Sequence, residues 1–223
     1  MIVECPVDEN RRNYRQFCGC ARALDRVGER WTLLIVRNLL LGARRYSDLL
    51  AELPGITTNL LAKRLKELEQ DGIVVRKETT PPNRVQVYDL GPAGQALEPV
   101  IMELGRWGGR FMGAPEPEDT INIGWGLLSL KRRYSGCLIG EVGFKIDDRE
   151  FELRFSREGF DVKERTAARP DVTVSGDLAS FQAWLFRGTS ATVLRKAGKL
   201  RVSGQAEVWE ALTRAFEPAR PPA

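Results

Sequence analysis

The chain has 223 residues, of which 43% are hydrophobic and 29% charged, a balance typical of folded globular proteins. Its net charge of +4 permits nucleic-acid binding without arguing for it, so such an argument depends on where the charges lie. The sequence contains no histidine, which excludes Ser-His-Asp and Cys-His nucleophiles and most zinc sites, and we do not expect an enzyme.

The cellular location and the cysteines narrow the class further. No apolar run approaches the roughly 20 residues that span a bilayer, and the stretch MIVECPVDENRRNYRQF lacks the apolar core of a signal peptide. We therefore expect a cytoplasmic protein with no membrane partner. Cys5, Cys18, Cys20 and Cys137 are too few and too scattered for a secreted disulfide framework or a metal site, so no metal and no cofactor are expected.

Four helices are predicted in the first part of the chain. A short one covers residues 21–27, and a strongly apolar one covers 30–41 and closes at Gly42. A third begins near Ser47, which suits an N-cap or first-turn position. The fourth follows the turn PGITTN and ends at Gly72.

A hairpin and a long helix are predicted next. Residues 73–90 form two strands around a Pro-Pro-Asn turn, and a helical pattern resumes at Pro92, with a kink expected at Pro99. Its apolar stripe consists of Leu97, Ile101, Leu104, Gly108 and Phe111, with Trp107 beside it. Residues 113–120, GAPEPEDT, have the composition of a linker and predict a domain boundary.

The fourth helix, TTNLLAKRLKELEQDG, has two distinct faces. Leu61, Leu65 and Leu68 form an apolar stripe that predicts packing on a core. The polar residues in a narrow arc opposite Leu61 are Asn59, Lys63 and Lys66. This face suits either a solvated helix surface or contact with a partner.

The order of three helices, a two-stranded wing and a long helix is that of a winged helix-turn-helix, in which the second helix of the turn enters the DNA major groove. Asn can then pair with adenine, and Lys can reach guanine or phosphate. A basic wing tip suits a phosphate or the minor groove, and the alternative for Arg84 is a solvated turn charge. The predicted DNA-binding residues are Arg45, Ser47, Thr57, Thr58, Asn59, Lys63, Lys66 and Arg84.

Residues from about 18 to 112 resemble the HxlR family of bacterial transcription regulators, relatives of MarR. The resemblance rests on the joint spacing of Gly-x-x-Trp-Thr, Arg-Tyr-Ser-x-Leu, Gly-Ile-Thr, Asp-Gly-Ile-Val and the Pro-Pro wing tip. It implies a homodimer, packed through terminal helices, that binds a two-fold related operator in double-stranded DNA. We expect a sequence-specific regulator of this type.

Cys18 lies thirteen residues before Trp31, where the HxlR family usually has a cysteine, and in some members that thiol senses oxidants or electrophiles. Arg15 and Arg22 are close in sequence and could lower its pKa. The alternative is a buried cysteine that acts as a small apolar residue. Cys5 lies too far upstream for the same role. A thiol-based redox regulator using Cys18 is thus an alternative function.

The second half predicts an α+β domain with a mostly antiparallel sheet, from strands such as LIGEVGFKI, EFELRFS, DVTVSG and KLRVSG and the helices DLASFQAWLFRG and AEVWEALTRAF. Residues 119–216 resemble a sterol-carrier-protein-like domain, which implies enclosure of a small apolar ligand. The candidate pocket residues are Trp125, Phe181, Trp184, Leu185 and Phe216, although aromatics at helical spacing also suit a packed core.

The predicted fold class is therefore α+β, with an N-terminal winged helix-turn-helix domain over residues 1–113 and a smaller sterol-carrier-like domain over 119–216. The second domain would sense an apolar effector or stabilise the dimer. A carrier or enzyme for an apolar substrate is the remaining alternative.

Overall fold

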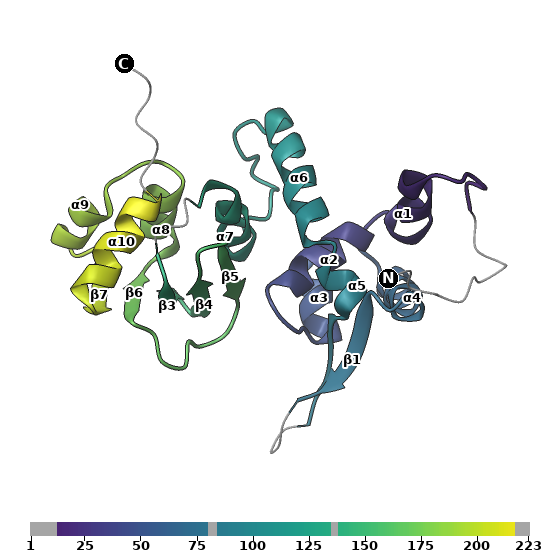
Figure 1. Ribbon diagram of the computed structural model, residues 1–223, viewed down its shortest axis with the longest axis horizontal. Coiled ribbons are helices and arrows are strands. Elements are labelled where there is room, and N and C mark those ends of the chain that lie inside the picture. The colour runs from purple at the N-terminus through teal and green to yellow at the C-terminus, as the bar shows by residue number, and fades with distance from the viewer. Residues whose placement is uncertain (1–12, 80–83, 135–137, 217–223) are drawn as a thin grey trace. The chain divides into compact units, whose positions relative to one another are not determined.

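The computed structural model describes residues 13–79, 84–134 and 138–216, and the chain divides into two compact units, Met1–Thr120 and Ile121–Ala223 (Figure 1). Each unit has its own buried core. Within the described ranges, no helix is long and apolar enough to cross a membrane.

The first unit begins with four helices and a hairpin (Figure 1). They are α1 (Gly19–Val27), α2 (Thr32–Leu40), α3 (Tyr46–Glu52), α4 (Thr58–Gln70), β1 (Val74–Glu78) and β2 (Gln86–Leu90), with the two strands antiparallel. Arg44 and Tyr88 exchange backbone hydrogen bonds of 2.9 and 2.7 Å. These bonds attach the hairpin to the loop between α2 and α3, so the wing is part of the folded unit.

The predicted leucine stripe of α4 is confirmed. Leu61, Leu65 and Leu68 are each at most 1% exposed. They share the core with α2 and α3, whose most buried side chains include Ile35, Leu39 and Leu49. Truncating one such leucine to alanine typically costs about 2–5 kcal/mol, so this stripe holds α4 on the unit.

Both ends of α4 are closed by local hydrogen bonds. The Thr57 hydroxyl accepts a hydrogen bond from the Leu60 N–H at 3.3 Å, which caps the first turn. At the other end Gly72 adopts a left-handed φ of +66°. Its N–H donates to the Glu69 carbonyl, and the Ile73 N–H donates to the Leu68 carbonyl, both at 3.0 Å. This Schellman arrangement ends the helix where the sequence predicts.

The predicted long helix from Pro92, kinked at Pro99, is wrong in one respect. The chain forms two helices, α5 (Pro92–Gln95) and α6 (Glu98–Gly108), followed by the 3₁₀ turn η1 (Gly109–Phe111). Pro99 lies in the first turn of α6, where a missing N–H breaks no hydrogen bond. The break therefore precedes the proline instead of bending a continuous helix around it.

The second unit contains a five-stranded sheet of order β5-β4-β3-β6-β7, in which β3 and β6 are parallel and all other pairs antiparallel. The strands are β3 (Gly140–Ile146), β4 (Arg149–Phe155), β5 (Phe160–Lys163), β6 (Val172–Gly176) and β7 (Leu200–Gly204). The mostly antiparallel α+β prediction is confirmed. The short strand β5 was not predicted.

One face of this sheet is apolar and packed by helices. The helices are α7 (Ile123–Leu130), α8 (Leu178–Leu185), α9 (Ala191–Lys196, not predicted) and α10 (Ala206–Phe216), with a 3₁₀ turn η2 (Lys131–Arg133) after α7. On α8, the rings of Phe181 and Trp184 lie 5.0 and 5.8 Å from the ring of Phe144 on β3. These contacts make the aromatic residues of α8 part of the core.

The opposite face of the sheet carries charges. Glu152 on β4 is only 2% exposed, and its carboxylate accepts hydrogen bonds from Arg154 (3.1 Å) and Arg165. Arg165 belongs to the segment between β5 and β6. A buried carboxylate needs such partners, so this ion pairing holds the segment against the sheet.

Candidate nucleic-acid interface

The polar arc of α4 faces solvent. Asn59, Lys63 and Lys66 are all exposed, on the side of the helix opposite the leucine stripe. Lys63 is 66% exposed, and its Nζ lies 4.0 Å from Oε1 of Glu67, one turn along the helix. A contact this long and this exposed is weak, so both lysines are available to an anionic partner.

The start of α4 is held by a residue that the sequence analysis missed. The Tyr46 hydroxyl, on α3, donates a 2.6 Å hydrogen bond to the carbonyl oxygen of Thr58. The side chains of Thr57 and Thr58 are exposed beside this contact, and the Thr57 hydroxyl caps the helix. The sequence signal that could have identified Tyr46 is its place in the Arg-Tyr-Ser motif, since a tyrosine hydroxyl can form a hydrogen bond.

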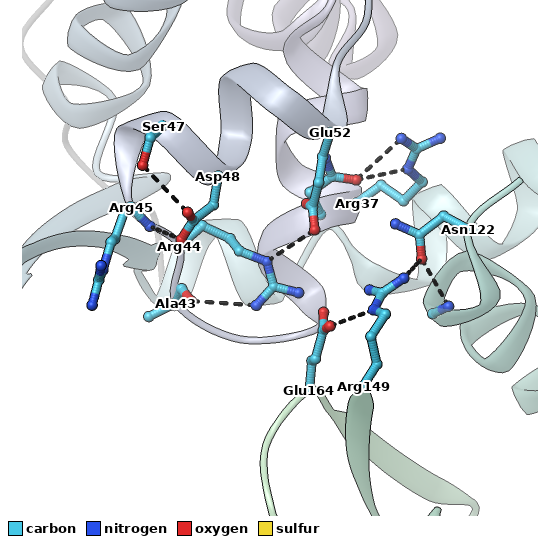
Figure 2. A network of polar contacts seen from close by, with 12 residues as sticks. Arg37, Ala43, Arg44, Arg45, Ser47, Asp48, Glu52, Asn122, Arg149 and Glu164 are labelled. Carbon is cyan, nitrogen blue, oxygen red and sulfur yellow. Dashed lines mark hydrogen bonds and ion pairs between the residues drawn. The ribbon is translucent and has the colours of Figure 1, made fainter. Parts of the chain in front are cut away.

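Arg45 is the N-cap residue of α3, and Ser47 and Asp48 lie in the first turn of this helix (Figure 2). The Arg45 N–H donates to Oδ2 of Asp48 at 3.1 Å, and the Ser47 hydroxyl donates to Oδ1 at 3.3 Å. Figure 2 shows the guanidinium of Arg45 extending away from Asp48. Arg45 is thus free to reach a phosphate, whereas Ser47 is engaged with its own helix.

The loop that leads into α3 is fixed by Arg44, which is 7% exposed (Figure 2). Its Nε lies 3.5 Å from Oε1 of Glu52, and its Nη1 donates to the Ala43 carbonyl. Nearby, burial lowers the pKa of Arg37 to about 10, an effect that Glu52 opposes. Arg44 and Arg45 are neighbours in sequence, yet one is structural and the other faces solvent.

The wing is tied to α4 by an ion pair. Nε of Arg76 on β1 lies 2.5 Å from Oε1 of Glu69 on α4, and its guanidinium lies over the Tyr88 ring, 5.4 Å from the centroid. The hydrogen bond to Glu69 raises the pKa of Arg76. Arg84 is exposed just before β2, while residues 80–83 of the predicted turn lie outside the described ranges.

The other flank of α4 is tied to α1 and the loop after it. Arg64 is 8% exposed, and its two terminal nitrogens lie 2.5 Å from carboxylate oxygens of Glu29 and Glu67. Asp71, at the end of α4, is 5% exposed and pairs with Arg26 of α1. In the sequence, Arg64 and Asp71 are charged residues beside the leucine stripe, which marks them as candidates for burial. Their partners across the chain could not be predicted from the sequence.

Cys18 is exposed and is the N-cap residue of α1, so the alternative of a buried apolar cysteine is wrong. Its sulfur does not make a hydrogen bond that caps the helix. Nevertheless, the backbone N–H groups of Ala21 and then Cys20 lower the pKa of the thiol. The cause is therefore the start of the helix, not the nearby arginines that the sequence suggested. Cys5 and Cys137 lie outside the described residues.

Four of the five pocket candidates lie in the core of the second unit: Phe181, Trp184, Leu185 and Phe216. Phe216 contacts the rings of Phe155 and Phe160 at centroid distances of 6.1 and 5.8 Å. Trp125, on α7, is half-buried. A recess of about 140 Å³ opens elsewhere on this unit, and its lining contains none of the five: Gly143, Phe144, Lys145, Glu150, Phe151, Thr166, Ala167, Pro170 and Thr173.

The first unit thus presents a helix with an apolar back and a basic front, flanked by a wing. This arrangement defines a winged helix-turn-helix DNA-binding protein. Residues 26–116 match the HxlR-like helix-turn-helix model, and the chain belongs to this family of transcription regulators. Residues 138–217, within the second unit, match the SCP-2 sterol transfer family.

Two curated relatives come from Bacillus subtilis (strain 168). The HTH-type transcriptional regulator YvaP is 40% identical over 87 residues, which are 39% of this chain and 80% of YvaP. The HTH-type transcriptional regulator YodB is 39% identical over 100 residues, covering 44% of this chain and 86% of YodB. The solved structure of reduced YodB aligns with 45% of this chain and with 100% of the YodB chain, at 32% sequence identity and a TM-score of 0.39.

Proposed function

We propose that this transcription regulator binds as a homodimer to a two-fold related operator, and that α4 of each protomer reads one half-site. Asn59 would contact a base, Lys63 and Lys66 a base or phosphate, and Arg45 and Arg84 the backbone. The observation that carries this assignment is the exposed polar arc of α4 backed by three fully buried leucines. Such a regulator would work in the cytoplasm, where bacterial DNA lies, and would not be an enzyme.

Exposed apolar side chains on α6 and η1 support the homodimer. Leu104 and Trp107 on α6, Phe111 on η1 and Met112 directly after it are 46%, 59%, 71% and 81% exposed, and the Trp107 and Phe111 rings lie edge to face with centroids 4.8 Å apart. A contiguous apolar surface of this kind usually marks a protein interface. A second copy of the chain would cover it and would place two recognition helices for a two-fold related site.

The test starts from a DNA duplex that the full-length protein selects from a random pool, compared with a scrambled duplex of the same composition. Lys63→Ala should weaken binding to the selected duplex about tenfold or more. Lys196→Ala, which removes one exposed positive charge from α9 in the second unit, is the matched control and should bind normally. Equal affinity for both duplexes, or equal affinity of both variants, would contradict the assignment.

Residues 1–113 would form the DNA-binding and dimerisation domain, and residues 119–216 a domain that senses an apolar effector or stabilises the dimer. The match to the SCP-2 sterol transfer family supports an apolar ligand. A ligand that binds only the folded protein raises its melting temperature by mass action. Palmitic acid and cholesterol are suitable probes. Stabilisation by a probe that leaves DNA affinity unchanged would favour the carrier alternative instead.

A thiol switch at Cys18 is a second candidate function on the same scaffold. It is favoured by the exposed sulfur, which an oxidant can reach, and by the lowered pKa, which increases the fraction of reactive thiolate. Diamide should then weaken DNA binding by wild type but not by Cys18→Ser. Cys20→Ser removes the exposed neighbouring thiol and is the control that should still respond.

A further inference from the structure

Two charged residues of α4 face α1 and the loop after it, and the four groups involved are here called the α1–α4 clamp: Arg26, Glu29, Arg64 and Asp71. Arg64 and Asp71 are seven residues apart, about two helical turns, so they lie on the same flank of α4. Arg26 lies in the last turn of α1, and Glu29 follows two residues after the helix. The clamp therefore joins the two segments at two points.

The clamp is nearly buried on the α4 side. Arg64 and Asp71 are 8% and 5% exposed, so each charge has lost most of its water. Among the described residues, the positive charge of Arg64 is paired with the carboxylates of Glu29 and Glu67. Its third nitrogen, Nε, is buried without a hydrogen-bond partner among those residues. Removing one carboxylate would leave a poorly compensated buried charge, and the helix would have to move to rehydrate it.

Outside the clamp, α1 buries few of its side chains against the described residues. Only Ala21 and Val27 of this helix are buried, and Leu24 is 45% exposed. Two small apolar side chains fix a helix loosely against its neighbour, whereas a forked guanidinium at 2.5 Å from its carboxylates has a defined direction. The relative placement of α1 and α4 thus depends on the ion pairs.

The position of the clamp around α4 matters for reading DNA. It lies between the leucine stripe and the polar arc, and on the other flank Glu69 is held by Arg76 of the wing. The leucines alone resist a small rotation of α4 about its axis only weakly, because apolar contacts are not directional. Ion pairs on both flanks oppose such a rotation, which would swing Asn59 and Lys63 across the groove.

We infer that Arg64 and Asp71 are positioning residues: through Glu29 and Arg26 they fix the rotation of α4, and so set the affinity and base discrimination of the interface. This inference rests on the proposed function of α4. It assigns to α1 and the loop after it an indirect effect on DNA reading, through the orientation of α4.

Glu29→Gln in the full-length protein tests the inference. The variant makes the protein one unit more positive, so a purely electrostatic or structural role predicts equal or tighter DNA binding. Positioning predicts the opposite: about tenfold weaker binding to the selected duplex and unchanged binding to the scrambled one. Glu150→Gln is the matched control, because it removes an equally charged partner from an ion pair with Lys145 in the second unit, which makes no proposed DNA contact.

A double variant and an orientation measurement complete the test. If the pair acts as a unit, Glu29→Gln combined with Arg64→Gln should lose less affinity than the two single losses together. NMR residual dipolar couplings should show α4 reoriented relative to α2 in Glu29→Gln but not in Glu150→Gln. Asp71→Asn should act in the same direction, and Glu29→Gln, at a half-exposed site, remains informative if that variant does not fold.

Failure of the proposed DNA-binding function and failure of the positioning inference give different results. If wild type fails to distinguish the selected duplex from the scrambled one, the proposed function is wrong, and the dipolar couplings still decide whether the clamp orients α4. If wild type discriminates but Glu29→Gln matches Glu150→Gln in affinity, discrimination and α4 orientation, the positioning role is overturned.

Discussion

The Tyr46 hydroxyl donates a 2.6 Å hydrogen bond to the carbonyl oxygen of Thr58, joining the first turn of α3 to the first turn of α4. Carbonyls in the first turn of a helix already accept from within the helix, so this bond uses the second lone pair of Thr58. It fixes the end of α4 that presents Asn59. Through this hydrogen bond α3 can influence how α4 presents Asn59 to a base.

Replacing Tyr46 with Phe removes this hydrogen bond but keeps the ring. We expect a loss of about 0.5–1.5 kcal/mol in the free energy of unfolding, measured by urea denaturation. DNA binding to the selected duplex should weaken as well, because the start of α4 becomes less fixed. Tyr14→Phe, at an exposed ring outside this interface, is the control. Wild-type stability and affinity in Tyr46→Phe would remove the residue from the interface.

Replacing Asn59 with Ala should relax base preference at one position in each half-site. A good bidentate contact to a base contributes about 1–3 kcal/mol of discrimination. The measurement is competition between the selected duplex and duplexes substituted at single positions. A uniform loss of affinity across all duplexes would instead indicate a backbone contact.

Replacing Arg84 with Ala should make the salt dependence of DNA binding shallower by about one unit in the slope of log K against log salt, if it contacts a phosphate. Affinity should fall to a similar extent for selected and scrambled duplexes. Fluorescence anisotropy between about 50 and 200 mM salt provides the slope. An unchanged slope would mean that Arg84 is a solvated charge on the wing.

Replacing Trp107 and Phe111 together with Ser should shift the protein from dimer toward monomer, as measured by sedimentation velocity. Both rings are more than half exposed in the single chain, so their loss should cost the chain little of its own stability. DNA affinity should then fall, because each half-site would be bound separately. A double variant that remains dimeric would place the interface elsewhere.

The lowered pKa of Cys18 predicts a pH dependence of its chemistry. The helix N–H groups stabilise the thiolate, so the midpoint of alkylation against pH should lie below the ordinary value for cysteine. In Cys20→Ser, iodoacetamide labelling of Cys18 followed by mass spectrometry measures this midpoint. It should rise when the protein is unfolded in urea, because the helix start is then lost. Equal midpoints in both states would contradict the helix-based cause.

The sequence by itself determined the local features of the interface. The leucine spacing of α4 and its stop at Gly72 follow from periodicity and from the preferences of single residues, and both are observed. Such signals are local, because a helix repeats every few residues and its ends are satisfied by neighbouring groups. The same reasoning predicted the wing and the α+β second unit.

Only the tertiary structure decided which groups meet across long stretches of chain. Arg64 pairs with a carboxylate 35 residues away and Asp71 with a guanidinium 45 residues away, partners that no periodicity specifies. Local sequence patterns likewise did not specify that β3 pairs in parallel with β6 or that Cys18 is exposed. The sequence alone does not distinguish a solvated charged side chain from a buried one. Their burial is set by the packing of distant segments, and that packing determines which charges face solvent and which hold α4 in place.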